Sequence, residues 1–396
     1  MRVLLTTRAL AQPGGSETYL VTVARELRAL GHELTIYSPE LGAIAQRLRA
    51  EGFEVLDSLD GCPLPDVAHV QHATTAFRVR GRFPELPMVF VSHSSIYDIE
   101  NVPALASPQA VVVLSDVVGR RVRAGAWADT GTVVRLRQPI VTPHDDPALP
   151  ALPAQPGRAV LLGIRTGPIA PLLESACEAL GIELRQAGGH DTIVDDLTPE
   201  LMRADIVFAV GRTLLEGMAL GRAGFLIDDR GMGGFVDADS YEAFEAGAFA
   251  TFDPEPTTVD GLIDRIGQYR PSLGQVGREL VRRHHSARWH ACELVETYRT
   301  AIDLGPPPKV LLEPLCALAS RQADELFGLR QRDRAQQWAV VESERRRADA
   351  EVAREALDVT RRMLEAELQR IGETKTMRWS RPLREAYRRL AGPGAD

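Results

Sequence analysis

Short apolar runs alternate with helix-like segments from the N-terminus to residue 302. The runs are continuous rather than interrupted by polar residues, which is typical of strands buried on both faces of a parallel sheet. The alternation predicts an α/β fold in which crossover helices cover the sheets. The expected strands are Val3–Thr7, Leu34–Ser38, Val67–Gln71, Met88–Ser92, Val111–Leu114, Val133–Leu136, Ala159–Gly163, Ile182–Arg185, Ile206–Val210 and Ala223–Ile227.

Helical periodicity is clearest in SETYLVTVARELRALGHE, residues 16–33. Its apolar side chains recur every three or four residues, and Gly31 supplies a stop signal. Further helices are expected near Pro171–Leu180 and over residues 257–268, 271–284 and 287–302.

Changes in proline content and in hydrophobic periodicity divide the chain into parts. Residues 139–157 are crowded with proline and have no periodicity, so they should form a linker between two domains. The predicted parts are a first sheet domain (1–138), the linker (139–157), a second sheet domain (158–303), a connector (304–328), a long charged helix (329–371) and a tail (372–396).

The segment 329–371 contains no glycine or proline, which predicts one continuous helix of about 65 Å at 1.5 Å per residue. Its apolar positions do not keep one heptad register, so at most a weak or broken coiled coil is expected, with self-association as one consequence. The basic tail carries Trp379, Leu383, Tyr387 and Leu390 at helical spacing. It suits either an anionic membrane surface or docking on its own domain or on a second copy.

Composition narrows the class of protein. The 396 residues are 44% hydrophobic and 25% charged, and the formal net charge is −8, which argues against nucleic-acid binding. The four cysteines have no metal-ligand spacing. No signal peptide or membrane-spanning run is evident, so a cytoplasmic location is expected, with peripheral contact at the inner face of the membrane if the tail binds lipid.

Two stretches could bind an anion. In AQPGGSETYL, residues 11–20, Gly14 and Gly15 let a ligand approach the start of a helix, where free N–H groups lie; a plain turn capped by Ser16 is the alternative. It is not the Rossmann dinucleotide motif, so no nicotinamide cofactor is expected. Arg165, just beyond a strand in LLGIRTG, could meet a diphosphate, although a surface arginine is an ordinary finding.

The stretch ADIVFAVGRTLLEGMALGRAGFLIDD, residues 204–229, is the most informative. It should form a strand, a turn at Gly211-Arg212, a helix and a second strand, with the turn amides at the carboxyl edge of the sheet, where such sheets bind ligands. Glu216 lies one turn into the helix among apolar neighbours and could hold the two hydroxyls of a ribose. A glycine-rich loop, residues 228–234, could close over the same crevice.

Among the histidines, His93 directly follows a strand in MVFVSHSS and should face the cleft, where it could hold a sugar hydroxyl. His69 and His72 are expected to be packed histidines, and His284 and His285 to lie at a helix end. No Ser-His-Asp or metal-type arrangement is evident, so no metal site is predicted.

Together these segments resemble glycosyltransferase family 4, whose members have the GT-B fold of two Rossmann-like domains facing a cleft. The resemblance rests on the order of GGSETYLVTVARELRALGHELTIYS, VFVSHSS, VVVLSDVVGRRV, RLRQPIVTP and ADIVF…LLEGMALGRAGFLIDD, within residues 1–302. The helix and TMRWSRPLREAYRRL resemble the tails of bacterial surface-polysaccharide glycosyltransferases.

The resemblance implies a retaining, metal-independent hexosyltransferase of polysaccharide or glycoconjugate biosynthesis. Its first domain would take a glycan or lipid-linked acceptor, and its second a nucleotide-diphospho-sugar donor, with no other cofactor. Glu216 would bind the ribose, Gly14, Gly15, Gly211, Arg212 and Thr213 the diphosphate or sugar, Arg165 the phosphate charge and His93 the transferred sugar.

Two positions depart from the family pattern. Phe208 stands where the family has a glutamate that holds the sugar ring, and RTGPIAPL lacks the usual lysine after Arg165. Arg212 or another arginine could replace the lysine. The departures also favour a second hypothesis, a catalytically silent GT-B scaffold or regulatory subunit of a polysaccharide assembly complex.

Overall fold

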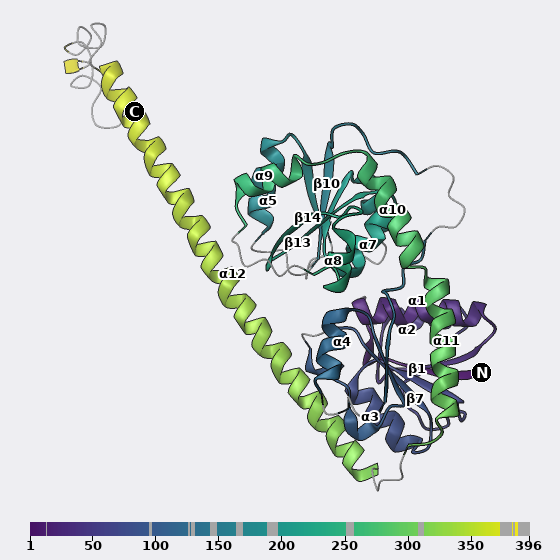
Figure 1. Cartoon of the computed structure of the whole chain (residues 1–396). Helices are drawn as coiled ribbons and strands as arrows, with labels where there is room; N and C mark the ends of the chain where they lie inside the picture. The colour runs from purple at the N-terminus through teal and green to yellow at the C-terminus, as the bar shows by residue number, and fades with distance from the viewer. Residues whose placement is uncertain are drawn as a thin grey trace. The chain divides into compact units, whose positions relative to one another are not determined.

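The computed structural model describes residues 1–12, 14–94, 97–125, 127, 131–142, 149–163, 169–187, 197–250, 257–307, 313–372, 382 and 385–386. The chain divides into two compact units, Met1–Glu325 and Leu326–Asp396. The first unit holds two sheets with helices on both faces (Figure 1). The predicted α/β class is confirmed.

The first lobe is built on a parallel sheet which, in the described residues, has seven strands in the order β5-β3-β1-β6-β7-β8-β9. Its strands are β1 Arg2–Thr6, β3 Glu33–Tyr37, β5 Glu54–Leu56, β6 Val67–Val70, β7 Met88–Ser92, β8 Ala110–Val113 and β9 Thr132–Arg135; β2 Ala9–Leu10 and β4 Glu40–Leu41 form a small separate sheet. Its helices are α1 Gly15–Ala29, α2 Ala43–Ala50, α3 Ala73–Arg82 and α4 Asp116–Arg123, with short 3₁₀ turns at Asp98–Glu100 and Ala104–Ala106. The order β1-β6-β7-β8 brings the ends of β1, β7 and β8 to one edge.

Helix α11, Ala287–Asp303, follows the second lobe in the chain but packs on the first. Its buried side chains Leu294, Val295 and Tyr298 share one core with α1 and the sheet. The chain therefore crosses between the lobes twice, once after β9 and once at the start of α11.

The second lobe has a sheet that includes five described strands in the order β11-β10-β12-β13-β14. These are β10 Arg158–Leu162, β11 Glu183–Ala187, β12 Ile206–Ala209, β13 Ala223–Asp228 and β14 Gly231–Phe235. Its helices are α5 Ala170–Ala179, α6 Thr198–Arg203, α7 Gly211–Ala219, α8 Tyr241–Ala246, α9 Val259–Ile266 and α10 Ser272–His284. Strand, turn, helix and strand follow one another through residues 206–228 as predicted.

The expectation of a glycine-rich loop over residues 228–234 is wrong for its second half. Residues Gly231–Phe235 form β14, which pairs antiparallel with β13. Gly231 and Gly234 adopt φ values of 141° and 96°, which side chains other than glycine rarely adopt, and the register shifts between Leu226 and Ile227. The glycines here shape an irregular edge strand, and only the turn before it reaches the cleft.

Helix α12, Glu313–Gly372, begins earlier than the predicted residue 329. Its first turns belong to the first unit: Ser320 Oγ donates to Thr74 O (3.3 Å), and Arg78 forms an ion pair of 2.9 Å with Asp324. In the second unit Met363 and Leu364 are exposed on the helix. The side chains Trp379, Leu383, Tyr387 and Leu390 lie outside the described residues. In the described part of the chain, no helix has the length and apolar character needed to cross a membrane.

Candidate functional site

A cavity of about 380 Å³ lies where the carboxyl edges of the two sheets face each other. The first-lobe wall comes from the start of α1, the turn after β7 and the start of α4, and includes Gly15, Ser16, His93, Ser94, Tyr97, Glu100, Ser115 and Val118. The second-lobe wall comes from the start of α7, the turn after β13 and the end of α8, and includes Val210, Gly211, Arg212, Leu215, Arg230, Glu245 and Gly247–Ala250. Its size falls within the ordinary range of ligand sites.

The structure brings several residues proposed from the sequence to this cavity. Gly15, His93, Gly211 and Arg212 line it. Gly14 is the N-cap of α1, next to the lining residues, and Thr213 and Glu216 follow in α7 but are not lining residues. Arg165 lies outside the described residues.

Helix α7 begins directly at the cavity. The chain passes from β12 into the helix through Gly211, whose φ of 58° favours glycine, and the N-cap Val210 offers no side-chain hydrogen bond. The Gly211 N–H donates to Phe249 O (2.8 Å). The first amides of an α-helix have no partner within the helix, and they carry its positive dipole end. This uncapped start is suited to an anion.

Each of the three guanidinium nitrogens of Arg212 donates a hydrogen bond within the protein. Nε donates to Glu216 (2.7 Å), Nη1 to Pro139 O (2.9 Å) and Nη2 to Thr22 Oγ1 (3.0 Å). Glu216 is therefore not turned into bulk water; its side chain is 27% exposed and paired with Arg212 one turn before it. Arg212 connects α7 to the linker and to α1, and it lines the cavity.

Phe208 stands where the family pattern has a glutamate, and its side chain does not reach the cavity. Phe208 is fully buried in β12 and packs edge-on against Phe225, with ring centroids 5.1 Å apart. Its side chain belongs to the core of the second lobe.

Two residues beside α7 have strained backbones that the sequence did not signal. Ala248 and Phe249 have φ values of 61° and 50°, unusual for side chains with a Cβ. Their conformation directs Phe249 O to the Gly211 N–H, and both residues line the cavity. Backbone strain of this kind is concentrated at functional sites.

The first-lobe wall places His93 above a layer of buried aromatic side chains. The Tyr19 ring packs edge-on against His93 at 4.6 Å, and the buried Nε2 of His93 has no hydrogen-bond partner among the described residues. Burial lowers the pKa of His93 well below 6.5, and the nearby His72, His69, His290 and Arg212 lower it further. The imidazole is therefore neutral at pH 7. The prediction that His69 and His72 are packed histidines is confirmed, because both are buried.

Glu100 is a second polar group of this wall, and sequence reasoning missed it. It lies in a 3₁₀ turn after β7, and its Oε2 accepts from the His93 N–H (3.0 Å). Burial raises its pKa to about 7, while hydrogen bonds from the Ser94 and His93 amides oppose that rise. In sequence, Glu100 has no motif around it; only the fold returns it to the end of β7.

Two histidines hold the linker between the lobes. Nδ1 of His290 donates to Arg137 O (2.9 Å), and Nδ1 of His285 donates to Gln138 O (2.8 Å). Because a carbonyl only accepts, these contacts place the ring proton on Nδ1 and leave Nε2 to accept. His290 Nε2 then accepts from Tyr19 of the first lobe (2.9 Å), and His285 Nε2 from Tyr241 of the second (2.8 Å).

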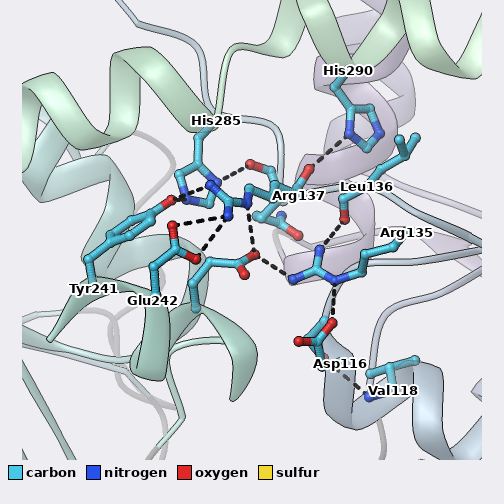
Figure 2. A network of polar contacts seen from close by, with 12 residues as sticks. Asp116, Val118, Arg135, Leu136, Arg137, Tyr241, Glu242, His285 and His290 are labelled. Carbon is cyan, nitrogen blue, oxygen red and sulfur yellow. Dashed lines mark hydrogen bonds and ion pairs between the residues drawn. The ribbon is translucent and has the colours of Figure 1, made fainter.

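Ion pairs surround these contacts (Figure 2). Arg135, at the end of β9, bridges Asp116 of α4 (3.1 Å) and Glu245 of α8 (2.5 Å). Arg137 pairs with Glu242 (3.0 Å). The side chain of Glu245 is only 7% exposed, so its charge depends on the two arginines. The sequence did not predict these ion pairs, because each one joins residues of different elements. The pairs with Glu245 and Glu242 join positions 110 and 105 residues apart, and the pair with Asp116 joins positions 19 apart.

Within the described residues, no group of three His, Cys, Asp or Glu side chains is placed to hold a metal ion.

Comparisons with known proteins support the fold. No family model and no curated protein sequence matches the chain. Among solved structures, HepE of Anabaena in complex with UDP and glucose is similar at a TM-score of 0.53 and 12% identity, over 76% of this chain and 100% of that one. An alpha-glucosyltransferase in complex with UDP and a 13-mer DNA is similar at 0.51 and 10%, over 76% and 99%. At such identities the likeness extends to the fold alone, and the chain has the GT-B fold.

Proposed function

We propose that this protein is a glycosyltransferase that moves a hexosyl group from a nucleotide-diphospho-sugar to a hydroxyl of a glycan or lipid-linked acceptor, in polysaccharide or glycoconjugate biosynthesis. The observation that carries the proposal is the cavity between the two carboxyl edges, with the uncapped start of α7 on its second-lobe wall. Two solved structures of the same fold support the choice of ligand: HepE, in complex with UDP and glucose, and the alpha-glucosyltransferase, in complex with UDP and DNA.

In this proposal the diphosphate lies against the start of α7. The amides of Arg212 and Thr213 and the positive dipole end would hold its charge, and Arg165 would add a cation from outside the described residues. The Gly14-Gly15 turn would contact the diphosphate or sugar from the first lobe, Glu216 would hold the ribose through its free carboxylate oxygen, and His93 would contact the transferred sugar. Arg230, which lines the cavity beside the end of β13, is a further cation for the missing lysine position.

We propose that transfer is retaining and independent of metal. Such a reaction asks the protein for positioning and for stabilisation of the charge that develops on the leaving diphosphate, which would itself take the proton of the acceptor hydroxyl. The location that we propose for the protein is the cytoplasm. Contact of its basic tail with the membrane would bring the protein to a lipid-linked acceptor.

A second candidate is the silent scaffold, because Phe208 is buried in the core and Arg212 is hydrogen-bonded to Glu216, Pro139 and Thr22 within the protein. One screen separates the two. Thermal shift and nucleotide release are measured with common UDP-, GDP- and ADP-sugars, with and without glycan acceptors, on the full chain and on Glu216→Ala. Stabilisation by a donor and acceptor-dependent release, both weakened in the variant, establish the transferase. Absence of release with every donor supports the scaffold, and unchanged donor affinity in Glu216→Ala refutes the ribose assignment.

A further inference from the structure

Among the described residues that line the cavity, two carry a carboxylate, and these are held in different ways. Glu245 accepts from Arg135 at 2.5 Å and lies 3.7 Å from Arg137, so two guanidinium groups balance its charge. Glu100, on the opposite wall, accepts from the backbone N–H of His93 and is in no ion pair within the described part of the chain. Backbone N–H groups orient the carboxylate of Glu100, but no described cation forms an ion pair with it.

The turn after β7 fixes the position of Glu100. Its own N–H donates to Tyr97 O (3.1 Å), and its carbonyl accepts from Ser92 Oγ (2.9 Å). With the N–H groups of His93 and Ser94 on the carboxylate, the side chain is held against the cavity before any ligand arrives. A preorganised acceptor of this kind loses little entropy on binding.

The chemistry of this corner differs from that of the α7 side. Glu100 accepts from the backbone N–H of His93, and both residues line this wall. A carboxylate repels phosphate, whereas the start of α7 on the other wall attracts it. A carboxylate on a wall whose histidine is neutral matches hydroxyl groups of an uncharged ligand.

We propose that Glu100 binds a hydroxyl of the sugar acceptor and determines which hydroxyl is presented to the donor. This inference rests on the proposed transferase function and adds a residue that determines acceptor specificity.

Ionisation of Glu100 gives the proposal a pH signature. Burial raises its pKa to about 7, Glu17 of α1 raises it too, and Arg121 of α4 and the two backbone donors lower it. Glu100 is therefore mostly protonated at pH 6 and mostly ionised at pH 8, while the ring of His93 stays neutral throughout. The ionised form is the stronger hydrogen-bond acceptor, so hydroxyl binding should strengthen as the pH rises through this range.

The test uses the full chain saturated with a nucleoside diphosphate chosen from UDP, GDP and ADP. Binding of free glucose, galactose and N-acetylglucosamine is then followed by saturation-transfer NMR from pH 6 to pH 8. Wild-type affinity for the preferred hexose should rise about tenfold with the ionised fraction. Glu100→Gln keeps a carbonyl oxygen for the His93 and Ser94 amides, and should lose about tenfold in hexose affinity at pH 8 together with the pH dependence, at unchanged nucleotide affinity. The control is Asp98→Asn, an exposed carboxylate of the same turn that does not line the cavity.

Hexose binding and a pH profile equal to wild type in Glu100→Gln would overturn the proposal, as would failure of the nucleotide-loaded wild type to bind any hexose. Failure of the wild type to bind any nucleoside diphosphate is a different result: it refutes the proposed transferase function and removes the basis of this inference with it.

Discussion

The two walls of the cavity satisfy their polar groups in opposite ways. On the second-lobe side, Arg212, Glu216 and Glu245 are held in ion pairs and hydrogen bonds within the protein. On the first-lobe side, beneath the end of β7, His93 Nε2, His69 Nε2 and both polar atoms of the Gln71 amide are buried without a partner among the described residues. The polar groups at the second-lobe wall are thus charges balanced by ion pairs, whereas those at and behind the first-lobe wall include neutral groups without a described hydrogen-bond partner and the carboxyl group of Glu100.

The difference has a physical consequence. Arginine remains charged throughout the accessible pH range, so the second-lobe wall keeps its charge pattern. Imidazole and a buried carboxyl change charge between about pH 3 and pH 7, so the first-lobe wall depends on pH. The uncapped start of α7 with nearby arginines suits a diphosphate, and a wall with neutral histidines and one buried carboxyl group suits sugar hydroxyls.

The largest effect that we expect is a loss of stability of the folded protein in acid, because buried histidines must take up protons. Burial lowers the pKa of His69, His285 and His290 to about 3 and that of His72 to about 4. Below pH 6.5 these histidines bind protons in the unfolded chain but stay neutral in the folded protein. The free energy of unfolding therefore falls with decreasing pH. Each histidine costs about 1.4 kcal/mol per pH unit, or on the order of 8 kcal/mol for the four at pH 5, an upper limit that approaches the whole stability of a typical domain.

Chemical denaturation of the full chain at pH 7.5, 6.5, 5.5 and 5.0 measures this loss. Glu100 acts in the other direction, since its raised pKa favours the folded state as the pH falls from 7 to 4.5, and it offsets about one histidine. His72→Asn should reduce the pH dependence of the free energy of unfolding by the contribution of one histidine, about 1.4 kcal/mol per pH unit. A free energy of unfolding that stays level from pH 6.5 to pH 5 would show that these four histidines are hydrated in the folded protein rather than buried in a dry interior.

The sequence predicted the framework of this contrast well. Continuous apolar runs identified β1, β6, β7 and β12, and the Gly211-Arg212 turn was placed correctly between β12 and α7, because both signals are local in the chain. His93 was expected at the cavity for the same reason: the residue after a buried parallel strand lies at the carboxyl edge.

What the sequence could not predict depends on contacts between distant residues. Glu100 reaches the cavity only because a 3₁₀ turn folds back on β7, and the partners of Arg135 and Arg212 come from other elements. The glycines at 231 and 234 indicated a loop, but pairing with β13 outweighed that local preference. The return of α11 to the first lobe likewise follows from tertiary packing.

The next largest effect tests the balance of the second-lobe wall. Arg212→Met removes three hydrogen bonds and leaves the partly buried Glu216 without its cation, which should cost about 2 to 3 kcal/mol in the free energy of unfolding. The exposed Arg203 provides the control: Glu200, its partner, keeps a second ion pair with Arg185, so Arg203→Met should change stability by less than about 0.5 kcal/mol. Equal effects of the two substitutions would mean that the connection between α7, the linker and α1 is not rigid in solution.

A smaller effect is expected from the turn that opens α7. Gly211→Ala forces a Cβ into a backbone with φ of 58°, and should cost about 1 to 2 kcal/mol and weaken nucleotide binding by misplacing the first amides. Gly15→Ala, at the start of α1 on the opposite wall, is the matched control: no atom lies within 4 Å of the added methyl group, and stability should change little. The comparison is made by thermal unfolding, and a neutral Gly211→Ala would show that the turn relaxes freely.

The smallest effect separates the two tyrosines that reach the linker through histidines. Tyr241→Phe and Tyr19→Phe each remove the hydroxyl that donates to a histidine Nε2, and each should cost about 1 kcal/mol. The cost should be larger for Tyr19, because His290 does not line the cavity and, among the described residues, only Tyr19 donates to its Nε2. His285, the partner of Tyr241, lines the cavity, where water can replace the lost donor, and Arg137 also lies within reach of the Tyr241 hydroxyl and ring. Urea denaturation of both variants at pH 7.5 measures the two costs. A larger loss for Tyr241→Phe would reverse the comparison and locate the drier of the two linker contacts in the second lobe.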